Sequence, residues 1–316
     1  MRNIDWEKFA VIDSDGDHAA VPALCGFFYF AAGVHEVAVE LARSVERYVG
    51  LVGLAALKSY AAKSGDWKPM TGRQLDRDLK RLRDFPKDHR AVHVEYEAGE
   101  GGEPGDFGLQ IAAYAEDEDF VNRASLLRVD FPPRWLDGHD VEELIRFVSE
   151  ICLLPHTQSA QVGLTFKSTT GSHGDAAAEI LHKLPRYFGF SPSGFRLYDE
   201  ILGHTFTAHW LNYVDNSLAA AVGGQRAIVK ALPECDVRKL AKGVLIRGAK
   251  LPPIGDINRK APDLGRLPEV ARLLKPTRLD IEATYLANED PSFYAAKWIA
   301  RLDDMDPRPW DNSGAM

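Results

Sequence analysis

Residues 91–115 read AVHVEYEAGEGGEPGDFGLQIAAYA, two apolar segments separated by a Gly-rich acidic stretch. In the first segment, Ala91 to Glu97, apolar and polar residues alternate, which is the pattern of a half-buried strand. Phe107 to Ala115 is a second strand candidate, and Ala98 to Asp106 between them has the composition of a hairpin loop. With a third strand predicted at Ser125 to Phe131, this region is expected to form an antiparallel meander.

The chain before the meander combines one buried strand with two helices. Ala20 to Phe30 (AVPALCGFFYF) is continuously apolar and predicts the strand. From Val34 to about Lys63, apolar residues recur at three- and four-residue steps, as on one face of a long helix. Gly50 and Gly53 are positions where this helix could kink or split. Gln74 to Phe85 predicts a second helix with a charged, solvated outer face.

The chain after the meander continues this mixture of elements. We predict helices at His139 to Cys152, Gly174 to Leu184, Ala208 to Val222 and Pro268 to Leu274, and strands at Ala160 to Phe166 and Gly243 to Gly248. Gly223-Gly224 is a typical signal for the end of the third of these helices. Trp210 and Tyr213 lie at helical spacing within it and are expected in the core. The order of elements predicts an α+β fold, with antiparallel or mixed sheets covered by helices.

The length of 316 residues fits one compact domain over residues 1–316. It could divide into two similar-sized lobes, 20–155 and 156–300, although no low-complexity linker marks a joint. The tail, 303–316, contains prolines, glycine and acids and is expected to be loosely ordered. Cys25, Cys152 and Cys235 are expected to be buried, reduced thiols, because each lies beside apolar residues.

Charge and the N-terminal sequence limit the partners and the location. The 38 Lys+Arg against 46 Asp+Glu give a net charge of −8. An acidic chain is a poor direct ligand for nucleic acid but is compatible with a basic protein partner. MRNIDWEKF at the N-terminus lacks the apolar core of a signal peptide, and no segment reaches the ~20 apolar residues of a membrane span. The expected location is therefore the cytoplasm.

The densest acidic runs lie around the predicted hairpin loop and just after its second strand. We predict these acids as candidate partner-binding residues, with simple solvation as the alternative: Glu95, Glu97, Glu100, Glu103, Asp106, Glu116, Asp117, Glu118 and Asp119. If both strands form, the second run returns to the opposite end of the sheet from the loop. The two runs are therefore not expected to form one continuous patch.

Motifs that would indicate catalysis or a cofactor fail on spacing. The acidic stretch 13–17 has glycine in the wrong place for a calcium loop, and His35 lacks the second histidine of a zinc-protease helix. The glycines of 99–105 match neither a dinucleotide-binding nor a phosphate-binding loop. We therefore expect no metal, no cofactor and no enzymatic activity. The alternative is a hydrolase with a dispersed site that includes His204, His209 and Asp256.

Ordered motifs along the chain resemble those of a bacterial family of type VI immunity proteins, first described as a domain of unknown function. The similar segments are LPRYFG at 184–189, HWLNY at 209–213, Gly223-Gly224, GVLIRGA at 243–249, PIGDINR at 253–259, Phe28-Tyr29 and GDWKP at 65–69. Phe188 departs from the family pattern, which has proline there, and His209 stands where the family has asparagine.

The resemblance implies an immunity protein that binds and neutralises a cognate type VI secretion toxin, often a nuclease, inside the producing cell. The mechanism would be stoichiometric occlusion of the toxin, and the free protein could form a homodimer. Opposite charge on the two partners would speed formation of the complex. Besides the hydrolase, the remaining alternative is an adaptor that binds the secretion machinery.

Overall fold

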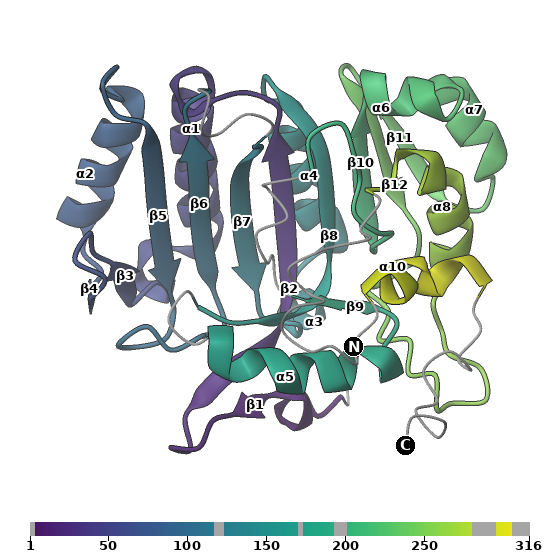
Figure 1. Ribbon diagram of the computed structural model, residues 1–316, viewed down its shortest axis with the longest axis horizontal. Coiled ribbons are helices and arrows are strands. Elements are labelled where there is room, and N and C mark those ends of the chain that lie inside the picture. The colour runs from purple at the N-terminus through teal and green to yellow at the C-terminus, as the bar shows by residue number, and fades with distance from the viewer. Residues whose placement is uncertain (1–3, 117–122, 170–172, 193–200, 280–294, 305–316) are drawn as a thin grey trace.

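One large sheet forms the centre of the protein (Figure 1). The computed structural model describes residues 4–116, 123–169, 173–192, 201–279 and 295–304. Within them the sheet has twelve strands, and its longest strand is β2 (His18–Phe30). β2 pairs antiparallel with β7 (Ser125–Phe131) on one side and β8 (Thr157–Lys167) on the other. Its continuous apolar sequence fits this place, because both faces of the central sheet are covered.

The predicted meander is confirmed and forms one half of the sheet. β7 pairs with β6 (Gly108–Tyr114), and β6 pairs with β5 (Ala91–Glu97) through the hairpin. Beyond β5, the short strands β3 (Ser59–Ala61) and β4 (Trp67–Pro69) end this side of the sheet.

The other half of the sheet comes from later parts of the chain. β8 pairs with β10 (Leu211–Asp215), which is followed outward by β12 (Gly243–Arg247) and β11 (Asp236–Leu240). Two short strands complete the sheet: β1 (Val11–Ile12) pairs antiparallel with β2, and β9 (Phe190–Pro192) pairs parallel with β8. A mixed sheet with helical layers confirms the α+β class.

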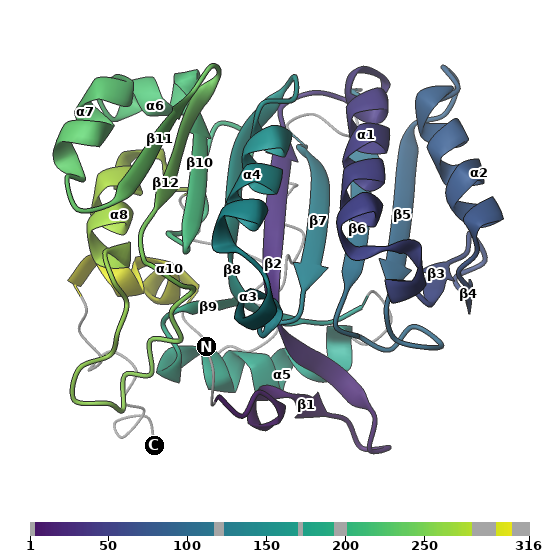
Figure 2. The ribbon, with the colours of Figure 1, turned by 180° about the vertical axis from the view of Figure 1, so that it is seen from behind.

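Helices cover both faces of the sheet. One face carries α1 (Val34–Val52), α2 (Gly72–Arg83), α3 (Trp135–Gly138) and α4 (Val141–Cys152), as Figure 2 shows. α5 (His173–Lys183) crosses the lower part of the opposite face. Beside β10–β12 lie α6 (Asn216–Ala221), α7 (Gly224–Ala231), α8 (Leu267–Leu274) and α10 (Ala295–Asp304). Short 3-10 turns occur at Glu7–Phe9, Leu54–Ala56, Leu184–Arg186 and Lys275–Thr277. Among the described residues, none of the helices has the length and apolar character that a membrane crossing needs.

Two helix predictions are corrected. The helix expected from Val34 to Lys63 ends at Val52, because Gly53 follows with a left-handed φ of 81°. The segment Ala208 to Val222 is not one helix but strand β10 followed by the short helix α6. Leu211 and Tyr213 pack into the core on one face of the sheet, and Val214 packs into the core on the other face. This segment is therefore a strand that is buried on both faces.

The remaining predictions concern Trp210, the C-terminal tail, Cys235 and the division into two lobes. Trp210 is buried as expected, but it lies immediately before strand β10 rather than in a helix. Asp303, at the start of the predicted loose tail, lies in the last turn of α10 and pairs with Arg278 at 2.7 Å, whereas residues 305–316 lie outside the described residues. Cys235 is only partly buried. The two lobes stay a prediction, although β2 and β8, which belong to different lobes, are neighbours in one sheet.

Candidate functional site

Two of the predicted partner-binding acids are not on the surface. Glu95 and Glu97 are only 1% and 0% exposed. Both project from the face of β5 opposite the helices α1 and α2. We expected that face to be open to solvent, but Arg128 from β7 and Lys167 from β8 lie over Glu97. The sequence pattern of β5 shows one polar face, yet it does not show that distant cations cover it.

The exposed acids divide between the two ends of the sheet. Glu100, Glu103 and Asp106 are exposed in the loop after β5, which we call the acidic loop (residues 98–106). Within it, Glu100 pairs with Lys58 at 3.5 Å and Asp106 with Arg134 at 3.0 Å. Glu116 is also exposed but lies beyond the far end of β6, as expected. Asp117, Glu118 and Asp119 lie outside the described residues.

A buried ionic cluster lies at the base of the acidic loop. It contains Glu97, Arg128, Asp130 and Lys167, all at most 4% exposed. Lys167 Nζ lies 2.6 Å from Glu97 Oε2 and 3.5 Å from Asp130 Oδ2. Arg128 contacts the same two carboxylates at 3.4 and 3.0 Å. Each charge therefore has opposite-charge neighbours, which buried ions require.

The cluster holds the returning arm of the acidic loop. Lys167 Nζ donates to the carbonyl oxygens of Gly105 (3.0 Å) and Phe107 (3.1 Å). The amide of Gly105 donates to Glu97 at 3.4 Å. Burial raises the pKa of Glu97 to about 7, against the opposing effect of Lys167 and then Arg128. The loop that displays the exposed acids is thus anchored to buried charges.

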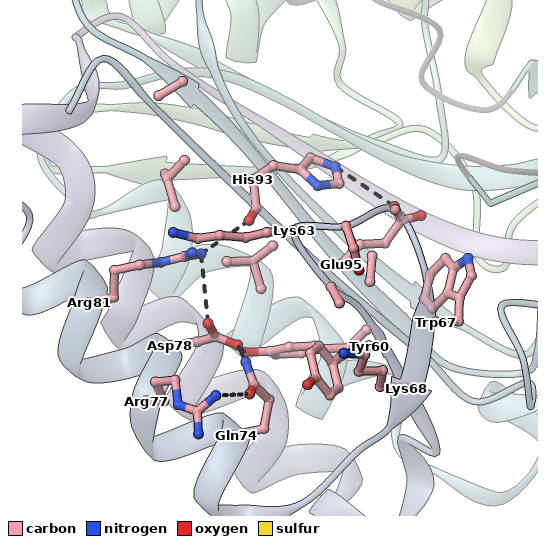
Figure 3. A pocket seen from close by; sticks show the side chains of 18 of the residues that line it. Tyr60, Lys63, Trp67, Lys68, Gln74, Arg77, Asp78, Arg81, His93 and Glu95 are labelled. Carbon is pink, nitrogen blue, oxygen red and sulfur yellow. Dashed lines mark hydrogen bonds and ion pairs between the residues drawn. The ribbon is translucent and has the colours of Figure 1, made fainter.

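Beside the acidic loop, a groove of about 870 Å³ lies along the outer edge of β5 (Figure 3). Its walls are the helix α2, the turn between β3 and β4, and the edge of β5 itself. The charged residues that line it are Lys63, Lys68, Arg77, Arg81, Asp78 and Glu95, and the aromatic ones are Tyr60, Trp67, Phe85, Tyr96 and Tyr114. Cations outnumber acids, so the groove is basic although the chain as a whole is acidic.

Hydrogen bonds order the α2 wall of the groove. The side chain of Thr71 accepts from the amide of Gln74 and caps the beginning of α2. Asp78, 6% exposed, accepts from Gln74 (2.8 Å) and from the hydroxyl of Tyr96 (2.9 Å). Arg81 lies 3.7 Å from Asp78 and donates to the backbone carbonyl of His93 at 3.1 Å. The groove is therefore preformed.

The groove and the acidic loop meet at Trp67. Gly102, near the tip of the loop, packs so closely on the indole ring that a Cβ on this glycine would lie 2.2 Å from Trp67. The backbone of Gly102 also has φ +94°, which favours glycine. An acidic and a basic element therefore lie next to each other on one surface, held by this contact.

The residues of the hydrolase alternative do not come together. His209 is 2% exposed, and burial followed by the neighbouring charge of Arg301 lowers its pKa to about 3. Asp256 instead binds Arg186 through both carboxylate oxygens, which lowers the pKa of Asp256. Within the described part of the chain, His204 shares no hydrogen-bond or ion-pair partner with either residue. Among the residues the structure describes, no group of three His, Cys, Asp or Glu side chains could hold a metal ion.

These features define a protein with a charged, preformed surface, and the comparisons place it among the type VI secretion immunity proteins. A family model described as TsiV, type VI immunity for VRR-NUC, matches residues 40–302, so the chain belongs to this family. The fold is similar to the solved structure of the Pseudomonas aeruginosa T6SS protein PA0821, with a TM-score of 0.76 at 16% identity, covering 95% of this chain and 90% of that one. Among curated proteins, none matches.

The family membership confirms the resemblance and the immunity function with a VRR-NUC nuclease as the target. The groove was not predicted from the sequence, because the short strands β3 and β4 and their pairing at the edge of β5 have no clear pattern there. One signal was present: the segment 65–69, GDWKP, matched the family pattern and supplies Trp67 and Lys68 to the groove.

Proposed function

We propose that this immunity protein inhibits its VRR-NUC nuclease by stoichiometric binding, with the acidic loop covering the cationic cleft that takes up DNA. The observation that carries the proposal is the anchoring of the loop to the buried ionic cluster through Lys167. A site that binds DNA needs clustered cations, and an acidic protein surface can compete for them. Glu100, Glu103 and Asp106 supply exposed carboxylates for this contact.

A fixed loop favours a tight complex. Ordering a flexible loop on binding would cost conformational entropy, and a loop already held at its base avoids much of that cost. Here the contacts of Gly105, Phe107 and Gly102 hold the loop before any partner arrives. Inhibition of this kind needs no chemistry by the immunity protein, so we propose that it has no catalytic activity.

The place of action and the assembly follow from the target. DNA in the producing cell is the molecule to be protected, so we propose that the protein acts in the cytoplasm. We propose a single domain that binds as a monomer, with a homodimer as the alternative that the mass of the free protein would reveal.

Glu103→Lys is expected to weaken the complex with the VRR-NUC toxin domain by about tenfold, because it places a cation against a cationic cleft. The loss should be largest at low salt and shrink as salt screens the charges. Isothermal titration without divalent metal, at two salt concentrations, measures both effects.

The matched control is Glu36→Lys, which changes the same charge at an exposed site near the beginning of α1, at the other end of the sheet. It should leave the affinity within about twofold, since exposed charges beyond a Debye length are largely screened. Equal affinities for Glu103→Lys and the native chain would rule out the acidic loop as the contact.

A further inference from the structure

The edge of β5 that faces the groove is largely open. β3 pairs with β5 only at Tyr96 and Glu97, and no described strand pairs with Ala91–Val94 on that side. An unpaired edge in an antiparallel sheet presents backbone N–H and C=O groups to any chain that can pair with it. Here the open edge forms the floor of the groove (Figure 3).

The direction of the backbone groups can be read from hydrogen bonds at both ends of β5. The carbonyl of Arg90 accepts from the amide of Ala115, and the amide of Ala98 donates to the carbonyl of Phe107. The backbone N–H and C=O groups of Arg90 and Ala98 therefore point toward β6. In an antiparallel strand the backbone groups of successive residues point to alternate edges. The N–H and C=O groups of Ala91 and His93 therefore point away from β6, toward the groove. The bond from Arg81 to the His93 carbonyl confirms this orientation.

Arg81 occupies the place that a neighbouring strand would take. A charged side chain over an open edge is a common way to prevent unspecific strand pairing. The guanidinium of Arg81 binds the His93 carbonyl from α2 and can give up that carbonyl to the N–H of an incoming strand. It would then be free to bind a carboxylate of the newcomer.

We propose that the toxin inserts an extended, acidic segment into this groove and adds it as a strand to the open edge of β5. This inference rests on the proposed function and names the partner's second point of contact. Backbone pairing with Ala91 and His93 gives the segment its register, and its alternate side chains face the groove walls. The acidic loop holds the basic cleft of the toxin while the basic groove holds an acidic strand, so the two contacts have opposite polarity.

Charge selects this occupant over a second copy of the chain. Lys63 and Lys68 are exposed and have no carboxylate partner among the described residues, so the groove has cations available for a ligand. Two copies joined edge to edge through β5 would bring two basic grooves together, which like-charge repulsion opposes. An acidic strand neutralises the same groups.

Hydrogen–deuterium exchange of the native chain with its VRR-NUC toxin domain, in buffer without divalent metal, tests the proposal. Peptides that cover Ala91–Glu95 should exchange at least about tenfold more slowly in the complex, because the outward amides become hydrogen-bonded. The matched control is β11 (Asp236–Leu240), at the other end of the sheet, whose exchange should stay unchanged. Equal slowing at both places, or a complex without slowing at β5, would overturn the inference.

The outcomes separate this inference from the proposed function. Failure to form any complex would count against the proposed function, whereas a complex with an unprotected β5 edge would leave it standing and reject only the added strand. Protection of the same peptides in the free chain as its concentration rises would identify a second copy as the occupant and also overturn the assignment.

A double charge reversal tests the polarity of the occupant. Lys63→Glu with Lys68→Glu changes two exposed side chains and should raise the Kd by at least about tenfold, because an acidic strand would meet like charges. Arg73→Glu is the control: it lies on α2 one turn before Arg77, is exposed and does not line the groove. An unchanged or improved affinity of the double variant would contradict an acidic occupant.

Discussion

Replacing Lys167 with methionine is expected to lower the free energy of unfolding by about 3–5 kcal/mol, the cost of breaking a buried charge network by removing one partner. Methionine keeps the length of the side chain but leaves Glu97 and Asp130 with Arg128 as their remaining cation in the cluster. It also removes the donor to the carbonyl oxygens of Gly105 and Phe107. Urea denaturation followed by circular dichroism measures the change.

The loss of stability in Lys167→Met should depend on pH in a defined direction. The pKa of Glu97 is raised to about 7 in the folded protein, so protonation of this carboxyl favours folding. That contribution is fully present below the unfolded pKa, about 4.3, and is lost as pH rises through the folded value. Without Lys167 the charged carboxylate is less well compensated, and the destabilisation should therefore be larger at pH 8 than at pH 5.

Lys87→Met is the control, because this lysine is exposed and its loss should change stability by less than about 0.5 kcal/mol. If Lys167→Met is no less stable than this control, the cluster does not fix the base of the acidic loop.

Gly102→Val is expected to weaken toxin binding by at least about tenfold, a loss of roughly 1.4 kcal/mol in binding free energy. A Cβ at this position would lie 2.2 Å from the ring of Trp67, so the loop and the indole ring must separate and the contact between them is lost. A β-branched residue at φ +94° also adds backbone strain of about 1–3 kcal/mol. Titration calorimetry measures the affinity, and thermal unfolding measures the strain.

Gly101→Val separates strain from displacement. Gly101 also has a positive φ, +65°, but a Cβ there would meet nothing within 4 Å. It should therefore lose stability without a comparable loss of affinity. Equal affinities for the two variants would show that the contact of Gly102 with Trp67 does not position the loop for binding.

The local pattern of the sequence predicted the meander well because alternation depends on neighbours in the chain. Val92, Val94 and Tyr96 face the helices, as the spacing indicates. The same logic failed at Leu211–Asp215, where a strand buried on both faces carries apolar residues on both sides and leads into an alanine-rich helix. Period alone does not distinguish such a segment from a helix.

The proposed binding surface was harder to predict because its parts are distant in the chain. Glu97 is an acid in a charged stretch, and its burial depends on Lys167, seventy positions later. The groove requires the register of β3 on β5, which leaves Ala91–Val94 uncovered. Neither relation has a local signal, whereas the exposed acids of the loop itself lie between strands and were predicted from composition.

Titration of DNA cleavage by the purified VRR-NUC toxin domain against this chain tests the central claim most directly. Stoichiometric occlusion predicts that activity falls in proportion to added chain and reaches zero at an equimolar ratio, with toxin well above the Kd. Loss of activity at a small fraction of one equivalent would indicate catalytic inactivation, and undiminished cleavage at an excess of the chain would contradict inhibition by binding.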